Sequence, residues 1–168
     1  MDSTQKEKFK MHCSRNRHNH ASIVYLWSLC SYNSISFSPV RKFIAKLGLL
    51  FFKIYGIGIE SSNIGGGLRL PHLNGIYIHG SVTIGENCTI LQQVTIGANE
   101  HKIDYKKAPK IGNRVYIGAG AKIIGGIVIG DDVRIGANAV VTKNIPAGMT
   151  VVGYNKVLEL KAEREGII

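Results

Sequence analysis

The sequence has 168 residues, with 21 Lys or Arg against 11 Asp or Glu, so its formal net charge is +10 at pH 7. With 45% hydrophobic residues, a chain of this length can bury one solid core and little more. No basic patch interleaved with stacking aromatics occurs in the repeats of this sequence, so a nucleic-acid partner is not expected. Three cysteines, Cys13, Cys30 and Cys88, make no paired framework, which predicts reduced thiols and a cytoplasmic protein.

The first 56 residues divide into a tail and a helical region. Residues 1–20 are polar and basic and lack the apolar core and cleavage site of a secretory signal, so we predict a disordered basic tail. Residues 21–56 are predicted to be helical, with one helix over residues 21–30 and another over residues 39–55. Pro39 opens the second helix at a position that the first helical turn accepts.

One face of the second predicted helix is apolar, because large residues recur along it at helical spacing. They are Phe43, Leu47, Leu50, Phe51 and Ile54. We expect this face to cover the end of the repeat domain or a neighbouring subunit. The alternative is peripheral contact with the inner face of a membrane, for which Phe51, Phe52 and the flanking lysines are suitable. Lys46 and Lys53 interrupt the run, so a helix that spans the membrane is not expected.

Residues 57–153 carry a six-residue period of large apolar residues. The period runs through Ile64, Leu70, Ile78, Ile84, Ile90, Ile96, Ile111, Ile117, Ile123, Ile129, Ile135 and Val141. Neither a helix nor a flat strand repeats every six residues, so the chain must turn a corner once per hexad. A β-sandwich would instead show strands at irregular or longer spacing. The pattern predicts a mainly β fold, a prism of short parallel strands with about four coils, followed by a C-terminal tail over residues 154–168.

The period breaks twice, and breaks in a repeat protein are where sites are built. Between Leu70 and Ile78 the step is eight residues instead of six, and the surplus contains His72. Between Ile96 and Ile111 the step is fifteen, which predicts a loop over residues 99–108.

The repeats and the segments around these breaks resemble the hexapeptide-repeat acyltransferases. The matching segments are Leu70-Pro71-His72, Gly75-Ile76-Tyr77-Ile78, Ile90-Leu91-Gln92-Gln93-Val94-Thr95-Ile96-Gly97, Pro109-Lys110-Ile111-Gly112 and Ile117-Gly118-Ala119-Gly120-Ala121-Lys122-Ile123. The resemblance is to the serine acetyltransferase branch and its relatives that acetylate sugars in bacterial polysaccharide assembly. It implies a left-handed parallel β-helix, acetyl-CoA as cosubstrate and a homotrimer, with no metal expected.

The resemblance also implies site residues. His72 matches the catalytic histidine of the family and is expected to act as general base, returning the proton to the leaving CoA thiolate. Acetyl-CoA is expected in a groove between two subunits, against the backbone of small residues, with lysines for its phosphates. The expected small residues are Gly97, Ala119, Gly120, Ala137 and Asn138, and the expected lysines are Lys122 and Lys143.

Three positions depart from the serine acetyltransferases. Pro71, Ile57 and Ala108 stand where that branch has two carboxylates and a second histidine. Unpaired zwitterion groups are costly to desolvate. We therefore expect a sugar hydroxyl of a capsule, exopolysaccharide or lipopolysaccharide precursor as the acceptor, with serine as the alternative.

The group that orients His72 stays open. Glu60 is one possibility and a backbone carbonyl is another. His101 is a possible second histidine. A less favoured alternative is a zinc-dependent carbonic anhydrase-like protein with His72, His79 and His101 as ligands.

Overall fold

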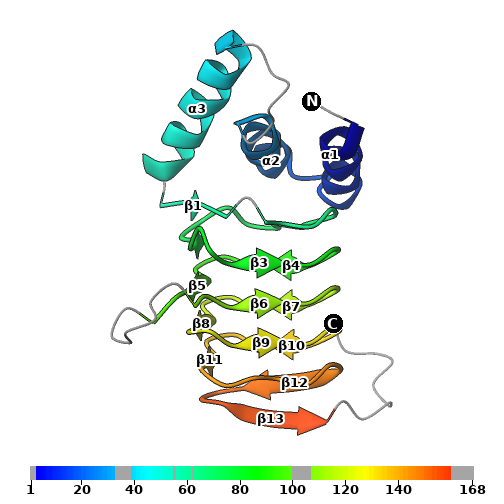
Figure 1. Cartoon of the computed structure of the whole chain (residues 1–168), viewed down its shortest axis with the longest axis vertical. Coiled ribbons are helices and arrows are strands. Elements are labelled where there is room, and N and C mark those ends of the chain that lie inside the picture. The colour runs from blue at the N-terminus through cyan, green and yellow to red at the C-terminus, as the bar shows by residue number, and fades with distance from the viewer. Residues whose placement is uncertain (1–2, 33–38, 55, 62, 100–106, 160–168) are drawn as a thin grey trace.

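The computed structural model describes residues 3–32, 39–54, 56–61, 63–99 and 107–159. Three helices come first, α1 (Ser3–Arg15), α2 (His20–Tyr32) and α3 (Pro39–Ile54). Short strands follow, as Figure 1 shows. They are β1 (Gly58–Ile59), β2 (Tyr77–Ile78), β3 (Thr83–Ile84), β4 (Thr89–Ile90), β5 (Thr95–Gly97), β6 (Lys110–Ile111), β7 (Tyr116–Ile117), β8 (Lys122–Ile124), β9 (Val128–Ile129), β10 (Arg134–Ile135), β11 (Val140–Val141), β12 (Met149–Val152) and β13 (Lys156–Glu159).

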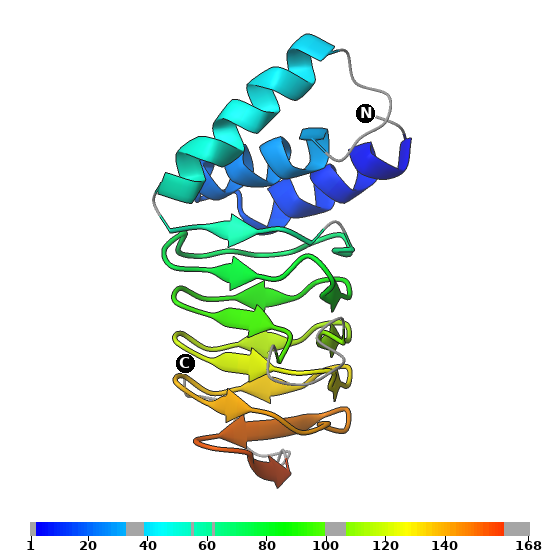
Figure 2. The same cartoon turned by 60° about the vertical axis from the view of Figure 1, so that its left-hand side comes forward.

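The strands form three sheets, which are the three faces of a prism. Face A contains β1, β2, β5, β8 and β11, face B contains β3, β6 and β9, and face C contains β4, β7, β10 and β12. Neighbours on each of these faces are parallel, and the chain visits A, B and C in turn. One circuit is therefore one coil, and the coils stack along the long axis (Figure 2). The predicted prism of parallel strands is confirmed.

The core is a triangular stack of aliphatic rungs. All twelve residues of the six-residue period are buried, and so are Ile59, Ile145 and Val151. These three lie on strands or bridges that continue the faces, because β1 pairs with β2, Ile145 bridges Ile129 and Val151 pairs with Ile135. The five strands of face A mark five coils, one more than the predicted four. The prediction missed the ends because Ile59 precedes Ile64 by five residues and Ile145 follows Val141 by four.

A second buried row lies beside the rungs, two positions before each of them. It includes Val82, Cys88, Val94, Val115, Ala121, Val133 and Ala139. The Cys88 thiol donates a hydrogen bond to the carbonyl of Gly112, with a distance of 3.2 Å from Sγ to the oxygen. Burial raises the pKa of this thiol, so Cys88 is a packing residue rather than a nucleophile.

Helices α1 and α2 cover the first coil, and they do so with polar side chains. Asn16 donates its side-chain amide to the carbonyl of Leu68 at 2.8 Å and accepts the backbone N–H of Leu70 at 2.9 Å. The Tyr25 hydroxyl accepts the N–H of Ile59 at 3.0 Å. The first coil has no coil above it, so these contacts satisfy backbone groups that would otherwise lack partners. The predicted disorder of residues 1–20 is therefore wrong over α1.

Helix α3 packs on α2 with a different face from the predicted one. Phe52 makes an edge-to-face contact with Tyr25, with ring centroids 5.1 Å apart, and a side chain at Gly48 would clash with Ser28. The predicted apolar face points away, with Phe43 68% and Ile54 77% exposed. The expectation that this face covers the coil is wrong for this chain, because α1 and α2 already fill that place (Figure 1). No helix in the described residues has the length and apolar character needed to cross a bilayer.

The other end of the coil is closed by a strand. Residues 154–168 were expected to form a tail, but β13 pairs antiparallel with β12, from Val152 opposite Lys156 to Met149 opposite Glu159. The predicted loop over residues 99–108 lies mostly outside the described residues.

Candidate active site

His72 lies in the first extended corner of the coil, between Leu70 and β2. Its side chain is exposed, while Leu73 packs partly against the core. The backbone before it is held by the helices, since Asn19 donates its side-chain amide to the carbonyl of Pro71 at 2.6 Å and Ser22 donates its hydroxyl to Leu70 at 2.6 Å. The imidazole is thus open to ligands on a fixed stretch of backbone.

Corners between faces C and A stack below His72 into one continuous column. We call this column the His72 edge, and it comprises residues 71–75, 91–93, 118–120 and 136–138. Backbone hydrogen bonds link its levels, from the N–H of Gln93 to Asn74, of Gly120 to Gln92 and of Asn138 to Ala119, at 2.8–2.9 Å. Ala119, Gly120, Ala137 and Asn138, predicted as cosubstrate contacts, therefore lie on the same edge as the predicted base.

Several side chains on this edge are small, but the packing requires this at some positions and not at others. Gly120 has φ +73°, and a Cβ there would overlap Oδ1 of Asn138. Ala137 has no such constraint and is exposed. Small residues at exposed positions leave the backbone open to close approach by a ligand.

Two of the other predicted contacts lie elsewhere. Gly97 ends β5, where it pairs with Ile124, and Lys143 follows β11. Both lie at the corners between faces A and B, which we call the loop edge because the long break in the six-residue period, after Ile96, falls there. Within one chain, face A separates them from His72. Lys122, by contrast, begins β8 next to the His72 edge, and its ammonium donates to the carbonyl of Gln93 at 2.6 Å.

The carboxylate considered for orienting His72 is not at its edge. Glu60 follows β1 at the loop edge, where its carboxylate accepts a hydrogen bond from the Tyr77 hydroxyl at 3.4 Å. His79 also follows its strand there, and its Nδ1 accepts the N–H of Ser81 at 3.2 Å. His101 lies outside the described residues. In the part of the chain that the structure describes, no group of three His, Cys, Asp or Glu is placed to hold a metal ion.

Two features of the site were missed by sequence reasoning. The anchoring contacts of Asn19 and Ser22 were missed because polar contacts leave no periodic pattern in the sequence. Gln92 lies in one of the matching segments but was not predicted as a site residue. Its Oε1 is buried and lacks a hydrogen-bond partner among the described residues. A buried amide oxygen without a partner is rare. It offers an acceptor one coil below His72 on the same edge.

Two of the three positions that depart from the serine acetyltransferases lie in apolar surroundings as well. Ile57 is 3% exposed and Ala108 is 9% exposed. They pack as part of the core.

Comparisons with known proteins agree with this architecture. The family model described as "Bacterial transferase hexapeptide (six repeats)" matches residues 108–143. A serine acetyltransferase of Helicobacter pylori strain J99 is 48% identical over 113 residues, which are 66% of this chain and 66% of that protein. The apoenzyme of soybean serine acetyltransferase superposes with a TM-score of 0.76 at 25% identity, over 94% of this chain and 70% of that one. A serine acetyltransferase in complex with CoA gives a TM-score of 0.66 at 25% identity, over 89% of this chain and 67% of that one.

These relatives confirm part of the prediction and overturn part of it. The chain spans just under two thirds of the Helicobacter protein. The comparisons agree with the predicted acyltransferase, because the matching family model is a transferase and one matching structure is a serine acetyltransferase in complex with CoA. The predicted sugar acceptor and polysaccharide pathway are wrong, because the relatives are serine acetyltransferases. The absence of charge at Pro71, Ile57 and Ala108 therefore did not identify the acceptor.

Proposed function

We propose that this chain, which belongs to the hexapeptide-repeat transferases and has serine acetyltransferases as homologues, is an acetyl-CoA-dependent serine O-acetyltransferase with a left-handed β-helix. One observation carries the proposal. The 48% identity to a serine acetyltransferase coincides with an exposed histidine at the head of an edge of small residues.

His72 is the proposed general base. As the serine hydroxyl attacks the thioester carbonyl, the imidazole accepts its proton, and it returns that proton to the CoA sulfur when the tetrahedral intermediate collapses. Acetyl-CoA supplies the activated acetyl group. The fixed backbone on both sides of His72 limits the positions that the ring can adopt, which favours a productive approach of the hydroxyl.

Gln92 is the proposed partner for a donor group of the acceptor. Its Oε1 is buried without a partner, and a serine ammonium would supply the missing hydrogen bond. Buried polar groups are strongly favoured when paired. Ile57 and Ala108 offer no charge, so this amide takes over part of what a carboxylate does elsewhere in the family.

The His72 edge fits the pantetheine arm of the cosubstrate, because Ala119 and Ala137 carry only a methyl group and so allow a ligand to approach the backbone on successive coils. Gly97 and Lys143 lie on the loop edge, across face A. In a homotrimer, the loop edge of one subunit can meet the His72 edge of the next. We therefore assign Gly97 and Lys143 to a neighbouring subunit's cosubstrate groove.

The test is an acetyl transfer assay on the purified chain, with release of free CoA thiol measured against serine, threonine, glycerol and glucose. Serine is expected to be the best acceptor, with O-acetylserine as the product by mass spectrometry. Thiol release with serine no faster than hydrolysis without acceptor would refute the proposal.

The shared groove has its own test. Co-expressed His72→Ala and Lys143→Glu chains should form mixed trimers with more activity than either variant alone, because some grooves then combine two intact edges. If mixing restores nothing, Lys143 does not act across a subunit boundary.

A further inference from the structure

The outer face of α3 holds seven of the thirteen large hydrophobic side chains that are exposed among the described residues. It comprises Val40, Phe43, Ile44, Leu47, Leu50, Phe51 and Ile54, each between 52% and 77% exposed. We call it the α3 stripe. Its spacings of three and four residues place all seven on one side of the helix, opposite the side that packs on α2.

A contiguous stripe of this kind marks an interaction surface rather than ordinary surface variation. The exposed apolar residues of the coil are instead spread over different faces. Val128, for example, lies on face B and Tyr116 on face C. The stripe is also not needed to hold α3, because Ala45 and Phe52 make the contact with α2. Its apolar area is therefore free for something outside this chain's own fold.

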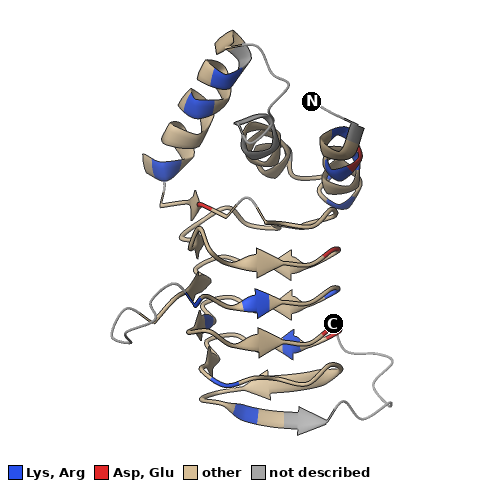
Figure 3. Ribbon diagram, viewed as in Figure 1, with Lys and Arg blue, Asp and Glu red and all other residues tan. Residues whose placement is uncertain are grey.

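The charges beside the stripe indicate what it meets. Lys42, Lys46 and Lys53 recur at spacings of four and seven residues, so they form a row along one flank of the stripe. Figure 3 shows blue segments along α3 and no red one. In the sequence up to residue 54, nine Lys or Arg stand against two Asp or Glu. The helical end of the molecule thus carries a formal net charge of +7, out of +10 for the whole chain.

An apolar stripe with a row of lysines and no acidic residue matches an anionic lipid surface, where the apolar side chains enter the acyl boundary and the lysines meet headgroup phosphates. A second copy of the chain fits less well, because it brings the same cations and no acidic residue of α3 to pair with them. We infer that α3 docks the enzyme on anionic membranes through this stripe. The coil then stands away from the surface, because α3 lies at the outer end of the helical cover (Figures 1 and 2).

Vesicle co-sedimentation of the full chain tests the inference independently of catalysis. The probes are vesicles of phosphatidylcholine alone and of an equimolar mixture with phosphatidylglycerol. The chain should sediment with the mixed vesicles and much less with the neutral ones, and added salt should weaken the binding. A chain that stays in the supernatant with both kinds of vesicle would overturn the inference.

Matched variants separate the stripe from general stickiness. Phe43→Ser with Leu47→Ser should lower the partition more than about tenfold, whereas Val128→Ser, which removes an exposed apolar residue of the coil, should leave it unchanged. Lys42→Gln, Lys46→Gln and Lys53→Gln together should cost roughly fivefold per lysine. The same charge loss on the coil, through Lys110→Gln, Arg134→Gln and Lys156→Gln, should cost much less.

Two results would contradict this assignment. Equal losses from the α3 lysines and the coil cations would show that net charge, not the stripe, drives binding. A drop in particle mass for Phe43→Ser with Leu47→Ser in sedimentation without lipid would identify the stripe as a contact between copies of the chain. Circular dichroism of each variant checks that the helices are intact.

Discussion

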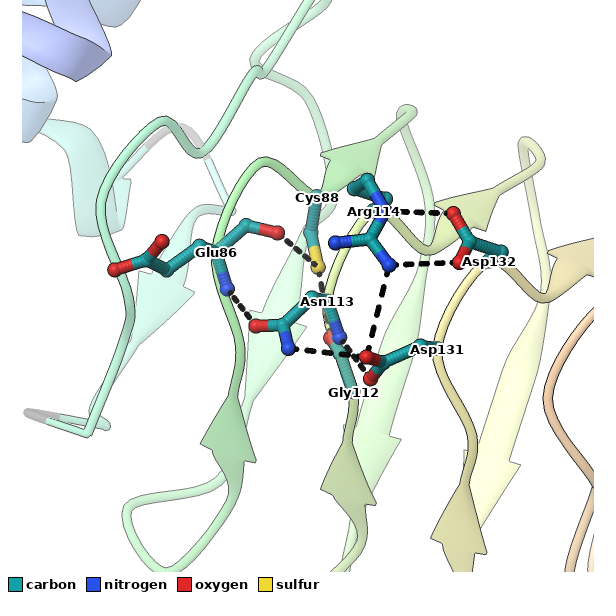
Figure 4. A network of polar contacts seen from close by, with 7 residues as sticks. All are labelled: Glu86, Cys88, Gly112, Asn113, Arg114, Asp131 and Asp132. Carbon is teal, nitrogen blue, oxygen red and sulfur yellow. Dashed lines mark hydrogen bonds and ion pairs between the residues drawn. The ribbon is translucent and has the colours of Figure 1, made fainter.

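Two edges of the same prism have opposite chemistry, although the same hexad builds both. The corners between faces B and C, which we call the B–C edge, use their side chains on their own backbone. Asn113 accepts the N–H of Glu86 at 2.8 Å and donates its amide to Asp131 at 3.2 Å (Figure 4). Arg114 forms two hydrogen bonds of 2.7 Å with Asp132. On the His72 edge the side chains that bind edge backbone come from outside the corners, with Lys122 donating to Gln93 and Asn19 to Pro71.

The difference separates structure from function within one repeat. Both edges need residues that accept a left-handed conformation, such as Asn87 and Asp132 on one and Gln93 and Asn138 on the other. Only the B–C edge covers its corners with a side-chain network. The His72 edge is the proposed cosubstrate groove, so substitutions on the two edges should affect different measurements.

The largest effect is expected at His72. His72→Ala should lower kcat for acetyl transfer roughly 10²- to 10⁴-fold, because it removes the base. CoA affinity and thermal stability should stay near those of the parent, since the exposed ring carries no rung of the core. The control is His79→Ala at the loop edge, where a mild effect is expected. Equal losses in the two variants would rule out a single base at His72.

A pair of alanine substitutions compares the edges directly. Ala137 on the His72 edge and Ala147 on the B–C side are both exposed and both occupy the second position of a corner. Ala137→Leu should raise KM for acetyl-CoA about tenfold with little change in kcat, because the added side chain covers backbone. Ala147→Leu should leave KM unchanged. Initial rates over a range of acetyl-CoA concentrations decide it, and a rise in KM for both variants would mean that small residues do not mark the groove.

Asn113→Ala should act on stability alone. Removal of its contacts to Glu86 and Asp131 should lower the free energy of unfolding by about 1–2 kcal/mol, measured by urea denaturation, with kcat and KM unchanged. Asn74→Ala, an exposed residue on the His72 edge, is the control, with an expected change within about 0.5 kcal/mol. Loss of activity in Asn113→Ala at full stability would contradict a purely structural B–C edge.

The smallest expected effect is on the stability of the protein at low pH. Hydrogen bonds from Asn113 lower the pKa of Asp131 below its ordinary value, and Arg114 lowers the pKa of Asp132. The unfolded state therefore binds the proton first as pH falls, and the stabilisation is present above the ordinary carboxyl pKa and lost through the lower folded value. Between pH 5 and pH 3, melting temperature should fall less for Asp131→Asn than for the parent chain. Parallel curves would mean that Asp131 adds nothing.

The buried side chain of His12 also makes the protein less stable as pH falls. This contribution must be separated from that of Asp131. The pKa of His12 is lowered to about 4 by burial, so stability is expected to decline from the ordinary histidine pKa of about 6.5 downward. The parent and Asp131→Asn share this decline, and only their difference below pH 5 reports on the B–C edge.

The central coils of the repeat domain could be predicted from the sequence, whereas the two ends of the domain could not. A period of six is a direct consequence of one corner per hexad, so the twelve rungs from Ile64 to Val141 could be assigned by inspection. Ile59 and Ile145 were not predicted as rungs, because they lie five and four residues from the nearest predicted rung instead of six. Helix α1 was not predicted, because its contacts with the coil are polar. Arg15, for example, donates to the carbonyl of Gly67 at 2.6 Å, and such pairing leaves no periodic trace in the sequence.

The site followed the same rule. His72 could be singled out as a candidate because a surplus corner and a motif coincide, and Ala119 and Ala137 because the hexad numbering places them in equivalent corners. The acceptor was not predictable from Ile57 and Ala108, since residues that are absent from a site do not specify which groups replace them. Gln92 Oε1 is visible as such a group only when its burial is known.

The antiparallel turn of β13 onto β12 has a consequence for assembly. A stack of parallel coils is open at both ends, and each open end could template another chain in the manner of a growing fibril. At one end α1 and α2 occupy the template. At the other, the reversal from Val152 to Lys156 presents a strand of opposite direction and different side-chain order. Together these covers keep a fold that could polymerise without limit at a fixed length of five coils.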